Sequence, residues 1–274
     1  MNRRLLVAAC CFGLAVAAAA LPAAVADGPP PGVVSDGAGI TSPDGKLRYF
    51  ALASGSQTLL EAVNVRGGTL FNETWLLGQF AIPAIAWTPT GMTPDGKTLV
   101  VETYPWLRGG ATFVVVRTPE LDRRRVVRLR GSWAYDAISP DGRTLYLIQS
   151  LASRDSAHYL VRAYDLRLGR LLTGAIADRR ERGPMTGAPV TRATTRTGTW
   201  AYTLYTKANG TAFVHALDTV HRRAVCIDLP WPDASAWIWE ARLHVSRDGT
   251  KLFLSTSGGG PRAVIDTRTW VVEV

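Results

Sequence analysis

Three carboxylates are candidates for shared acid–base chemistry. Asp36, Asp136 and Glu240 lie in the first, third and fifth of the repeats described below. Hydrolysis of a glycosidic bond needs one carboxyl group as a proton donor and a second at a defined separation, acting as base or nucleophile. These residues are therefore the candidate catalytic residues, and the fold must set their separation.

Four tryptophans are candidates for ligand binding. Trp87 and Trp133 each lie seven residues before a recurring proline, and Trp239 lies eight residues before Arg247, at the matching position of a later repeat. Trp106 lies in a neighbouring loop. Flat indole rings at a repeated position can stack on a sugar or a peptide, and they can equally fill the gap between adjacent sheets. The sequence leaves both interpretations open.

Basic residues outnumber acidic ones, 31 to 22, which gives a net charge of +9. Arginines accumulate in predicted turns at one end of the repeats, and the most basic of these turns contain Arg123, Arg124, Arg125, Arg222 and Arg223. An electropositive face would attract an anionic surface, such as a cell-wall polymer, lipid head groups or an acidic protein. The alternative is a set of solvated turns in a chain whose codon usage favours arginine.

Other motifs for catalysis or cofactor binding are absent from the sequence. It contains no Gly-x-Ser-x-Gly elbow, no P-loop, no dinucleotide fingerprint and no His-Glu-x-x-His. The histidines lack the spacing of metal ligands; they are His158, His215, His221 and His244. Cys226 lies in an alternating apolar run, where a small core residue is expected. We therefore expect no cofactor and no metal, and we favour a non-catalytic role.

A turn motif recurs along the chain and must position these residues. Ser/Thr-Pro-Asp-Gly occurs three times, Ser-Arg-Asp-Gly once, and a degenerate copy lies at 195–199. Proline presets the first central angle of a type I turn, aspartate suits the next position, and glycine accepts the positive φ that closes the turn. The motif glycines are 51, 46, 56 and 51 residues apart; they are Gly45, Gly96, Gly142, Gly198 and Gly249. A nearly constant period of this length is typical of a repeat fold.

Each turn is followed by runs that favour β-strands, such as 144–148, 159–164 and 212–217. Four antiparallel strands per repeat, repeated five times over residues 38–274, predict an all-β five-bladed β-propeller of four-stranded antiparallel blades. Six blades would need shorter repeats than these spacings allow. Residues 178–186 are expected to form an exposed insertion between the third and fourth repeats.

The motif resembles that of the WD40-like, TolB-like and YVTN-type propeller repeats, whose blades carry the same Ser/Thr-Pro-Asp-Gly-Lys/Arg-x-Leu turn. The resemblance covers residues 38–274, although the Trp-Asp dipeptide and the histidine of a WD40 blade are missing. It implies a scaffold that binds proteins or peptides. Some five-bladed sugar hydrolases use acids from different blades, so the alternative is a carbohydrate-active enzyme or lectin with its site at the channel mouth.

The first 26 residues have the pattern of a secretory signal peptide: Arg3 and Arg4, an apolar stretch, and Ala-Val-Ala at 24–26. A retained anchor is disfavoured because the apolar stretch is short for a membrane span. Lipid attachment at Cys10 is disfavoured because few apolar residues precede it. Residues 27–37 would then be a linker. We expect a secreted protein, extracellular or periplasmic, with no membrane span after cleavage, no nucleic-acid partner, and an unknown protein or anionic cell-envelope component as its partner.

Overall fold

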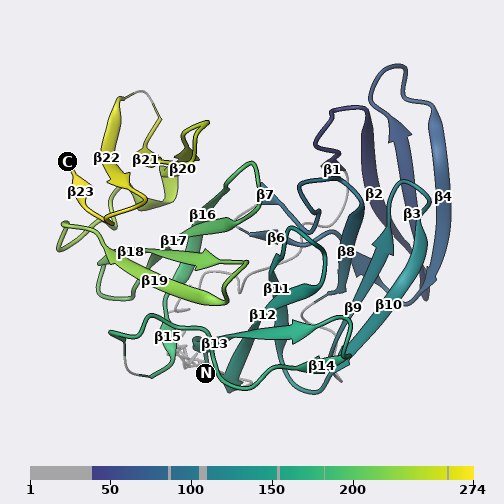
Figure 1. Ribbon diagram of the computed structural model, residues 1–274, viewed down its shortest axis with the longest axis horizontal. Helices are drawn as coiled ribbons and strands as arrows, with labels where there is room; N and C mark the ends of the chain where they lie inside the picture. Colours follow the sequence, from purple (N-terminus) through teal and green to yellow (C-terminus); the bar gives the residue numbers. More distant parts are fainter. Residues whose placement is uncertain (1–38, 86–87, 105–109, 153–154, 182, 258) are drawn as a thin grey trace, which may run out of the picture.

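The computed structural model describes residues 39–274 except 86–87, 105–109, 153–154, 182 and 258 (Figure 1). The expected signal peptide, the linker, Cys10 and Asp36 lie outside these residues. Five antiparallel sheets follow one another along the chain, which confirms the all-β class. Among the described residues the single helical element is a three-residue 3₁₀ helix, η1 (Ile238–Glu240), and no helix is long and apolar enough to cross a membrane.

The sheets are numbered 1 to 5 in chain order. Sheet 1 contains β1 (Ile40–Thr41), β2 (Leu47–Ser54), β3 (Gln57–Asn64) and β4 (Leu70–Leu77). Sheet 2 contains β5 (Phe80–Ala81), β8 (Thr98–Thr103), β9 (Ala111–Arg117) and β10 (Asp122–Leu129). Sheet 3 contains β11 (Trp133–Ile138), β12 (Thr144–Ala152), β13 (Asp155–Asp165), β14 (Arg170–Leu171) and β15 (Met185–Thr186).

The last two sheets repeat the four-stranded order. Sheet 4 contains β16 (Ala188–Thr194), β17 (Trp200–Thr206), β18 (Ala212–Asp218) and β19 (Arg223–Asp228). Sheet 5 contains β20 (Arg242–Val245), β21 (Lys251–Ser255), β22 (Pro261–Asp266) and β23 (Val272–Glu273). A separate hairpin interrupts sheet 2 between β5 and β8 and consists of β6 (Ala84–Ile85) and β7 (Thr88–Pro89).

The recurring motif forms the tight turn that its residue types predict. The amide of Gly45 donates to the carbonyl of Ser42 at 2.8 Å, and Gly45 has a φ of +72°. The Ser42 hydroxyl donates to Asp44 Oδ1 at 2.6 Å and accepts from the amide of Leu47 at 2.9 Å. The hydroxyl-to-aspartate bond recurs at 2.6 Å in the turns that begin at Ser139 and Ser246. Each turn therefore ties the first strand of its sheet to the second.

The other turn of each sheet lies beside this one. The hydroxyl of Thr219, which follows β18, donates to the carbonyl of Gly198 at 2.6 Å, and Thr267, which follows β22, donates to Gly249 at 2.7 Å. The Thr118 hydroxyl makes the same bond in sheet 2. The turns between strands one and two and between strands three and four therefore share one end of the fold, which we call the turn end.

Neighbouring sheets pack face to face through fully buried apolar side chains. Between sheets 1 and 2 the contact includes Tyr49, Leu60, Leu99 and Val114. The contact between sheets 4 and 5 is built the same way. Burying one such side chain stabilises a fold by roughly 1.5–3 kcal/mol, so these inter-sheet layers hold the sheets together.

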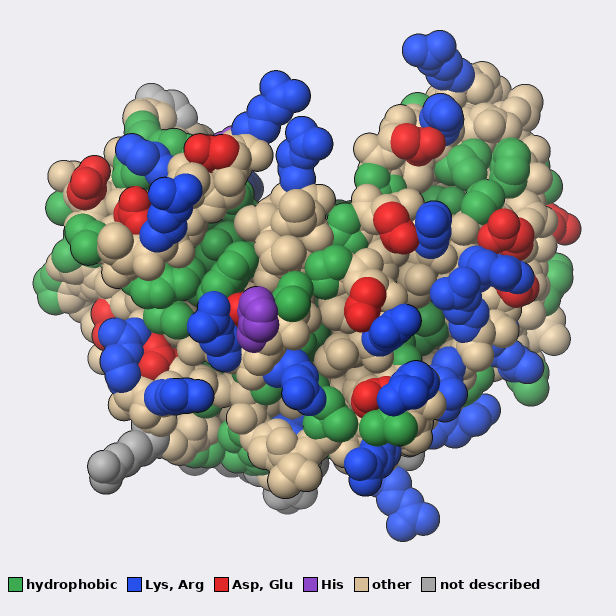
Figure 2. Space-filling model, viewed as in Figure 1, with side chains coloured by type: hydrophobic (Ala, Val, Ile, Leu, Met, Phe, Trp, Pro, Cys, Tyr) green, Lys and Arg blue, Asp and Glu red, His purple; other side chains and the backbone are tan. Residues whose placement is uncertain are grey.

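The five sheets are arranged as an arc around a common centre, as in a propeller (Figure 1). The β6–β7 hairpin lies at this centre beside β16. Figure 2 shows a deep notch between the part of the molecule formed by sheet 1 and the part formed by sheet 5. The number of blades in a closed ring therefore stays a prediction.

Candidate functional site

An ion pair lies buried near the centre of the arc. The pairing of β11 with β12 shifts register at Asp136, and such a bulge redirects the side chain. Arg192 of β16 donates through Nη2 to Asp136 Oδ1 at 2.5 Å and through Nη1 to the carbonyl of Asp136. The side chain of Asp136 is 1% exposed and that of Arg192 is 3% exposed. This pair joins the innermost strands of sheets 3 and 4.

The predicted catalytic acids occupy different environments. Asp136 faces Arg192, whereas Glu240 is exposed on η1, and Asp36 lies outside the described residues. A glycosidase needs carboxyl groups that reach the sugar on both sides of the scissile bond. The carboxylate of Asp136 is buried and bonded to a guanidinium, whereas that of Glu240 is exposed, so a catalytic site shared by these acids stays a prediction.

The predicted tryptophans also differ from one another. Trp133 is 7% exposed, and its indole nitrogen donates to the carbonyl of Arg130 at 2.9 Å, which fits the packing interpretation. Trp239 is 55% exposed on η1. Trp87 and Trp106 lie outside the described residues, so binding at an indole cluster stays a prediction.

A row of polar side chains crosses sheet 4 on the face that packs against sheet 3. Arg192, Thr203, His215 and Cys226 are register partners on successive strands, β16 to β19. Within the part of the chain that the structure describes, six buried polar atoms have no hydrogen-bond partner. Five lie in or near this row: Asp136 Oδ2, Tyr159 OH, Arg192 Nε, Thr203 Oγ1 and His215 Nε2. The sixth, Arg162 Nε, lies on the face of sheet 3 that packs against sheet 2. Burial lowers the pKa of His215 to about 4, so its ring is neutral at pH 7.

A second buried acid, Glu102, lies at the contact between sheets 2 and 3. Its Oε2 accepts the amide of Tyr135 at 2.7 Å. Burial raises the pKa of Glu102 to about 8, because the loss of solvation outweighs the hydrogen bond from Tyr135, which acts to lower the pKa. Glu102 was not predicted as a site residue, because nothing in the run Thr98–Thr103 indicates that its one acid points inward.

Residues 178–186 are not simply an exposed insertion, because Asp178 is buried and bonded to sheet 4. Asp178 Oδ2 accepts the amide of Cys226 at 2.8 Å, and Arg180 Nη2 donates to the carbonyl of Cys226 at 2.9 Å. The two side chains also pair with each other at 2.6 Å. They thus satisfy the outward-pointing backbone groups at the middle of β19, the outermost strand of sheet 4. Covering an edge in this way prevents unwanted strand pairing.

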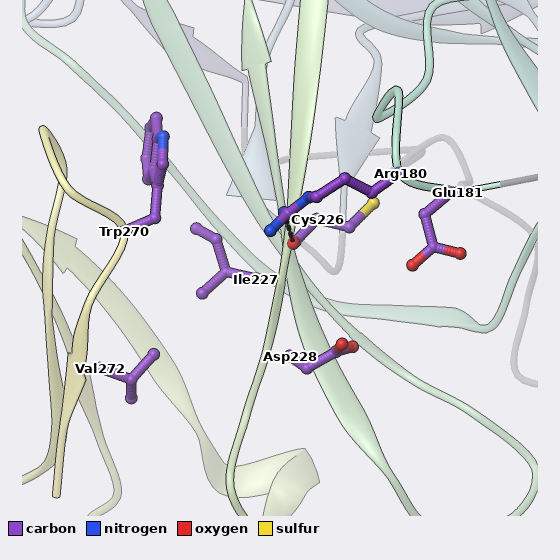
Figure 3. A pocket seen from close by; sticks show the side chains of 7 residues that line it. All are labelled: Arg180, Glu181, Cys226, Ile227, Asp228, Trp270 and Val272. Carbon is purple, nitrogen blue, oxygen red and sulfur yellow. Dashed lines mark hydrogen bonds between the residues drawn. The ribbon is translucent and has the colours of Figure 1, made fainter.

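A pocket of about 400 Å³ lies beside this edge (Figure 3). We call it the rim pocket; its lining comprises Arg180, Glu181, Cys226, Ile227, Asp228, Trp270 and Val272. Trp270 and Val272 lie on one side and Glu181 on the other. The hydrogen bond from Arg180 holds the pKa of Asp178 down at about 2, so their charges offset each other. The lining mixes apolar and charged groups and presents no single chemical character.

Basic side chains are concentrated on the outermost strand of sheet 2 and the adjoining turn of sheet 3. We call it the arginine patch; its exposed members are Arg123, Arg124, Arg128, Arg130, Arg167 and Arg170. Arg125 of β10 contacts the turn of sheet 3 at Gly169. Its Nη1 lies 2.9 Å from the point where a side chain at position 169 would begin, so the contact depends on glycine there. Figure 2 shows basic side chains gathered over β10 and β14.

Nearby acids offset only part of this charge: Asp165 lies in the same turn as Arg167 and Arg170, and Asp122 lies at the start of β10. Asp122 and Glu120 pair with Arg117, at 2.5 Å and 3.7 Å. Asp165 accepts the backbone amides of Arg167 and Leu168 and so closes its own turn.

The remaining predicted basic residues lie in sheet 4. Arg223 donates to Asp218 at 2.8 Å and lies over the ring of Trp200, while Arg222 is exposed in the same turn. The structure therefore brings Arg123, Arg124 and Arg125 together with arginines of sheet 3, and places Arg222 and Arg223 in a separate turn.

No known protein-family profile matches the chain, and no curated protein matches it. Solved structures similar to it include TolB from Acinetobacter baumannii, at 16% identity and a TM-score of 0.46, with 82% of this chain and 51% of that one covered. The dihydro-haem d1 dehydrogenase NirN, in complex with DHE, is similar at 14% identity and a TM-score of 0.51, covering 88% and 46%. A puromycin hydrolase S511A mutant, complexed with PGG, is similar at 16% identity and a TM-score of 0.51, covering 88% and 39%.

The chain spans about half the length of the TolB structure that it matches. Identities this low show the fold and carry no activity across. The repeated four-stranded sheets arranged about a centre have the architecture that the sequence motif predicts. The chain is therefore a β-propeller protein, and its resemblance to TolB-like propellers is a resemblance of fold.

Proposed function

We propose that this protein is an exported, non-catalytic propeller scaffold of five blades that binds an anionic component of the cell envelope. The observation that carries the proposal is the arginine patch, where exposed arginines of β10 and of the neighbouring turn of sheet 3 lie on either side of the contact between Arg125 and Gly169. Export rests on the signal-peptide pattern of residues 1–26.

The patch suits a polyanion better than a single small anion. Its arginines are spread along β10, on both faces of this outermost strand, and over the turn of sheet 3, and they do not converge on one pocket. Each guanidinium can form two parallel hydrogen bonds with a phosphate or carboxylate. A basic side chain near an anionic surface contributes about 1 kcal/mol, so several acting together give useful affinity without any enclosed site.

The test is binding to inorganic polyphosphate, a soluble polymer with the repeating phosphates of an anionic envelope polymer. Arg123→Ser combined with Arg124→Ser should weaken binding by about 30-fold, because two contributions of about 1 kcal/mol are lost. The matched control removes the same charge elsewhere at the turn end, with Arg66→Ser and Arg196→Ser, both exposed.

The control variant should bind nearly as well as the unaltered chain. Equal weakening by both variants would show attraction by net charge alone and would contradict a localised site. Binding that does not weaken with added salt would contradict the electrostatic basis, because exposed charges are screened over about 10 Å at 0.1 M salt.

A further inference from the structure

Buried polar atoms without a hydrogen-bond partner are concentrated in one layer between sheets. Among the described residues, none of them lies between sheets 1 and 2 or between sheets 4 and 5. The layer between sheets 3 and 4 contains five: Asp136 Oδ2, Tyr159 OH, Arg192 Nε, Thr203 Oγ1 and His215 Nε2. None of these residues is more than 7% exposed. A buried polar atom without a partner is costly, so five in one layer point to a shared partner.

These groups lie next to one another across the layer. Arg192, Thr203 and His215 are register partners on β16, β17 and β18, which places their Cβ atoms about 5 Å apart. The Asp136 carboxylate of sheet 3 is bonded to Arg192 at one end of this row. Tyr159 packs in the same layer from the side of sheet 3. The atoms therefore form one connected cluster.

The chemistry of the cluster selects water as the partner. Arg192 Nε can only donate a hydrogen bond and the Asp136 carboxylate can only accept one, whereas the Thr203 hydroxyl can do both. A bound anion would face the Asp136 carboxylate, and a bound cation would face the Arg192 guanidinium. Within the described residues, no group of three or more His, Cys, Asp or Glu side chains could hold a metal ion. Water both donates and accepts hydrogen bonds, so it suits every atom of the cluster.

A small cavity adjoins the outer end of the row. Its volume is about 50 Å³, and its lining includes Phe213 and Cys226, which are buried in the layer between sheets 3 and 4. Cys226 is the register partner of His215. A water molecule needs roughly 10–15 Å³ of such space, so the cavity has room for water and is too small for a larger organic molecule. Exposed Glu181 and Asp228 also line it, so it gives solvent a route to the row.

We propose that ordered water molecules bind in the layer between sheets 3 and 4 and bridge Asp136 Oδ2, Arg192 Nε, Thr203 Oγ1 and His215 Nε2. They enter through the small cavity beside Cys226. The bound water supplies hydrogen bonds that these side chains do not make to one another, and it is part of the folded structure. The site lies apart from the arginine patch and does not depend on it.

A crystal structure of the chain, at a resolution that shows ordered water, tests the proposal directly. Density for water within hydrogen-bond distance of at least two of these four atoms is the expected result. A dry layer, direct hydrogen bonds among the four side chains, or density for an ion or an organic molecule would each overturn the proposal.

Replacement of the Thr203 hydroxyl tests the same site in solution. Thr203→Val keeps the shape of the side chain and removes Oγ1. Because water bonds to that hydroxyl, the variant loses a hydrogen bond, and its midpoint of urea unfolding should fall. A hydroxyl without a partner gives the opposite sign, because its removal relieves an unpaired buried group.

Thr58→Val is the matched control. Thr58 is as deeply buried as Thr203, and its hydroxyl donates to the carbonyl of Gly78 and accepts the amide of Phe80, both at 2.8 Å. Its midpoint should fall because known hydrogen bonds are lost, and this fall calibrates the one expected for Thr203→Val. A Thr203→Val midpoint equal to or above that of the unaltered chain would overturn the proposal.

Discussion

Removing one partner of the Asp136–Arg192 pair should be strongly destabilising. Arg192→Met keeps an unbranched chain of similar length and leaves the Asp136 carboxylate buried without a positive partner. Breaking a buried pair in this way typically costs about 3–5 kcal/mol, because an uncompensated charge stays away from water. Urea unfolding followed by circular dichroism measures the loss as a lower midpoint.

The double replacement sharpens this prediction. Asp136→Leu combined with Arg192→Met removes both charges, along with the unpartnered atoms Asp136 Oδ2 and Arg192 Nε. Apolar replacement of both partners is often neutral or stabilising, so the double variant should be more stable than Arg192→Met alone. A loss below about 1 kcal/mol for Arg192→Met would refute the reasoning, since that is the value of a solvent-exposed pair.

Three further predictions follow from buried and edge groups. Burial raises the pKa of Glu102 to about 8 in the folded state, so the free energy of unfolding should fall as pH rises from about 4.5 to 8. Glu102→Gln should remove that pH dependence, which urea titrations at several pH values measure. Burial lowers the pKa of His215 to about 4, so stability that is present above pH 6.5 is lost as pH falls toward 4. His215→Phe should reduce this loss of stability at low pH in the same titrations. Asp178→Ala leaves the amide of Cys226 unpaired, which should cost about 1–3 kcal/mol and increase aggregation measured by light scattering. A flat pH profile in the unaltered chain, or an Asp178→Ala variant as stable and soluble as it, would contradict the corresponding assignment.

Local chemistry explains which parts of the fold were predictable. The Pro-Asp-Gly turns depend on residues that are adjacent in sequence, and the serine–aspartate bond closes each turn within two residues. The strands after each turn follow from the same short-range pattern. The period of the motif then sufficed to predict five successive antiparallel sheets, of which four have the predicted four strands, whereas the fifth strand of sheet 3, β15, was not predicted.

Contacts between distant segments explain what was missed. Asp136 and Arg192 are 56 residues apart, and nothing near either residue in the sequence indicates its partner. The same holds for Asp178, which lies 48 residues from the strand edge that it covers. The β6–β7 hairpin at the centre is too short for a periodic signal, so nothing in the sequence indicates that a hairpin lies there.

Hydrogen–deuterium exchange with and without bound polyphosphate tests the central claim, that the arginine patch is the binding surface, most directly. We predict slower exchange in β10 and in the turn of residues 165–170, with η1 and β4 unchanged. Protection centred on η1 around Trp239, or spread evenly over the turn end, would contradict the claim.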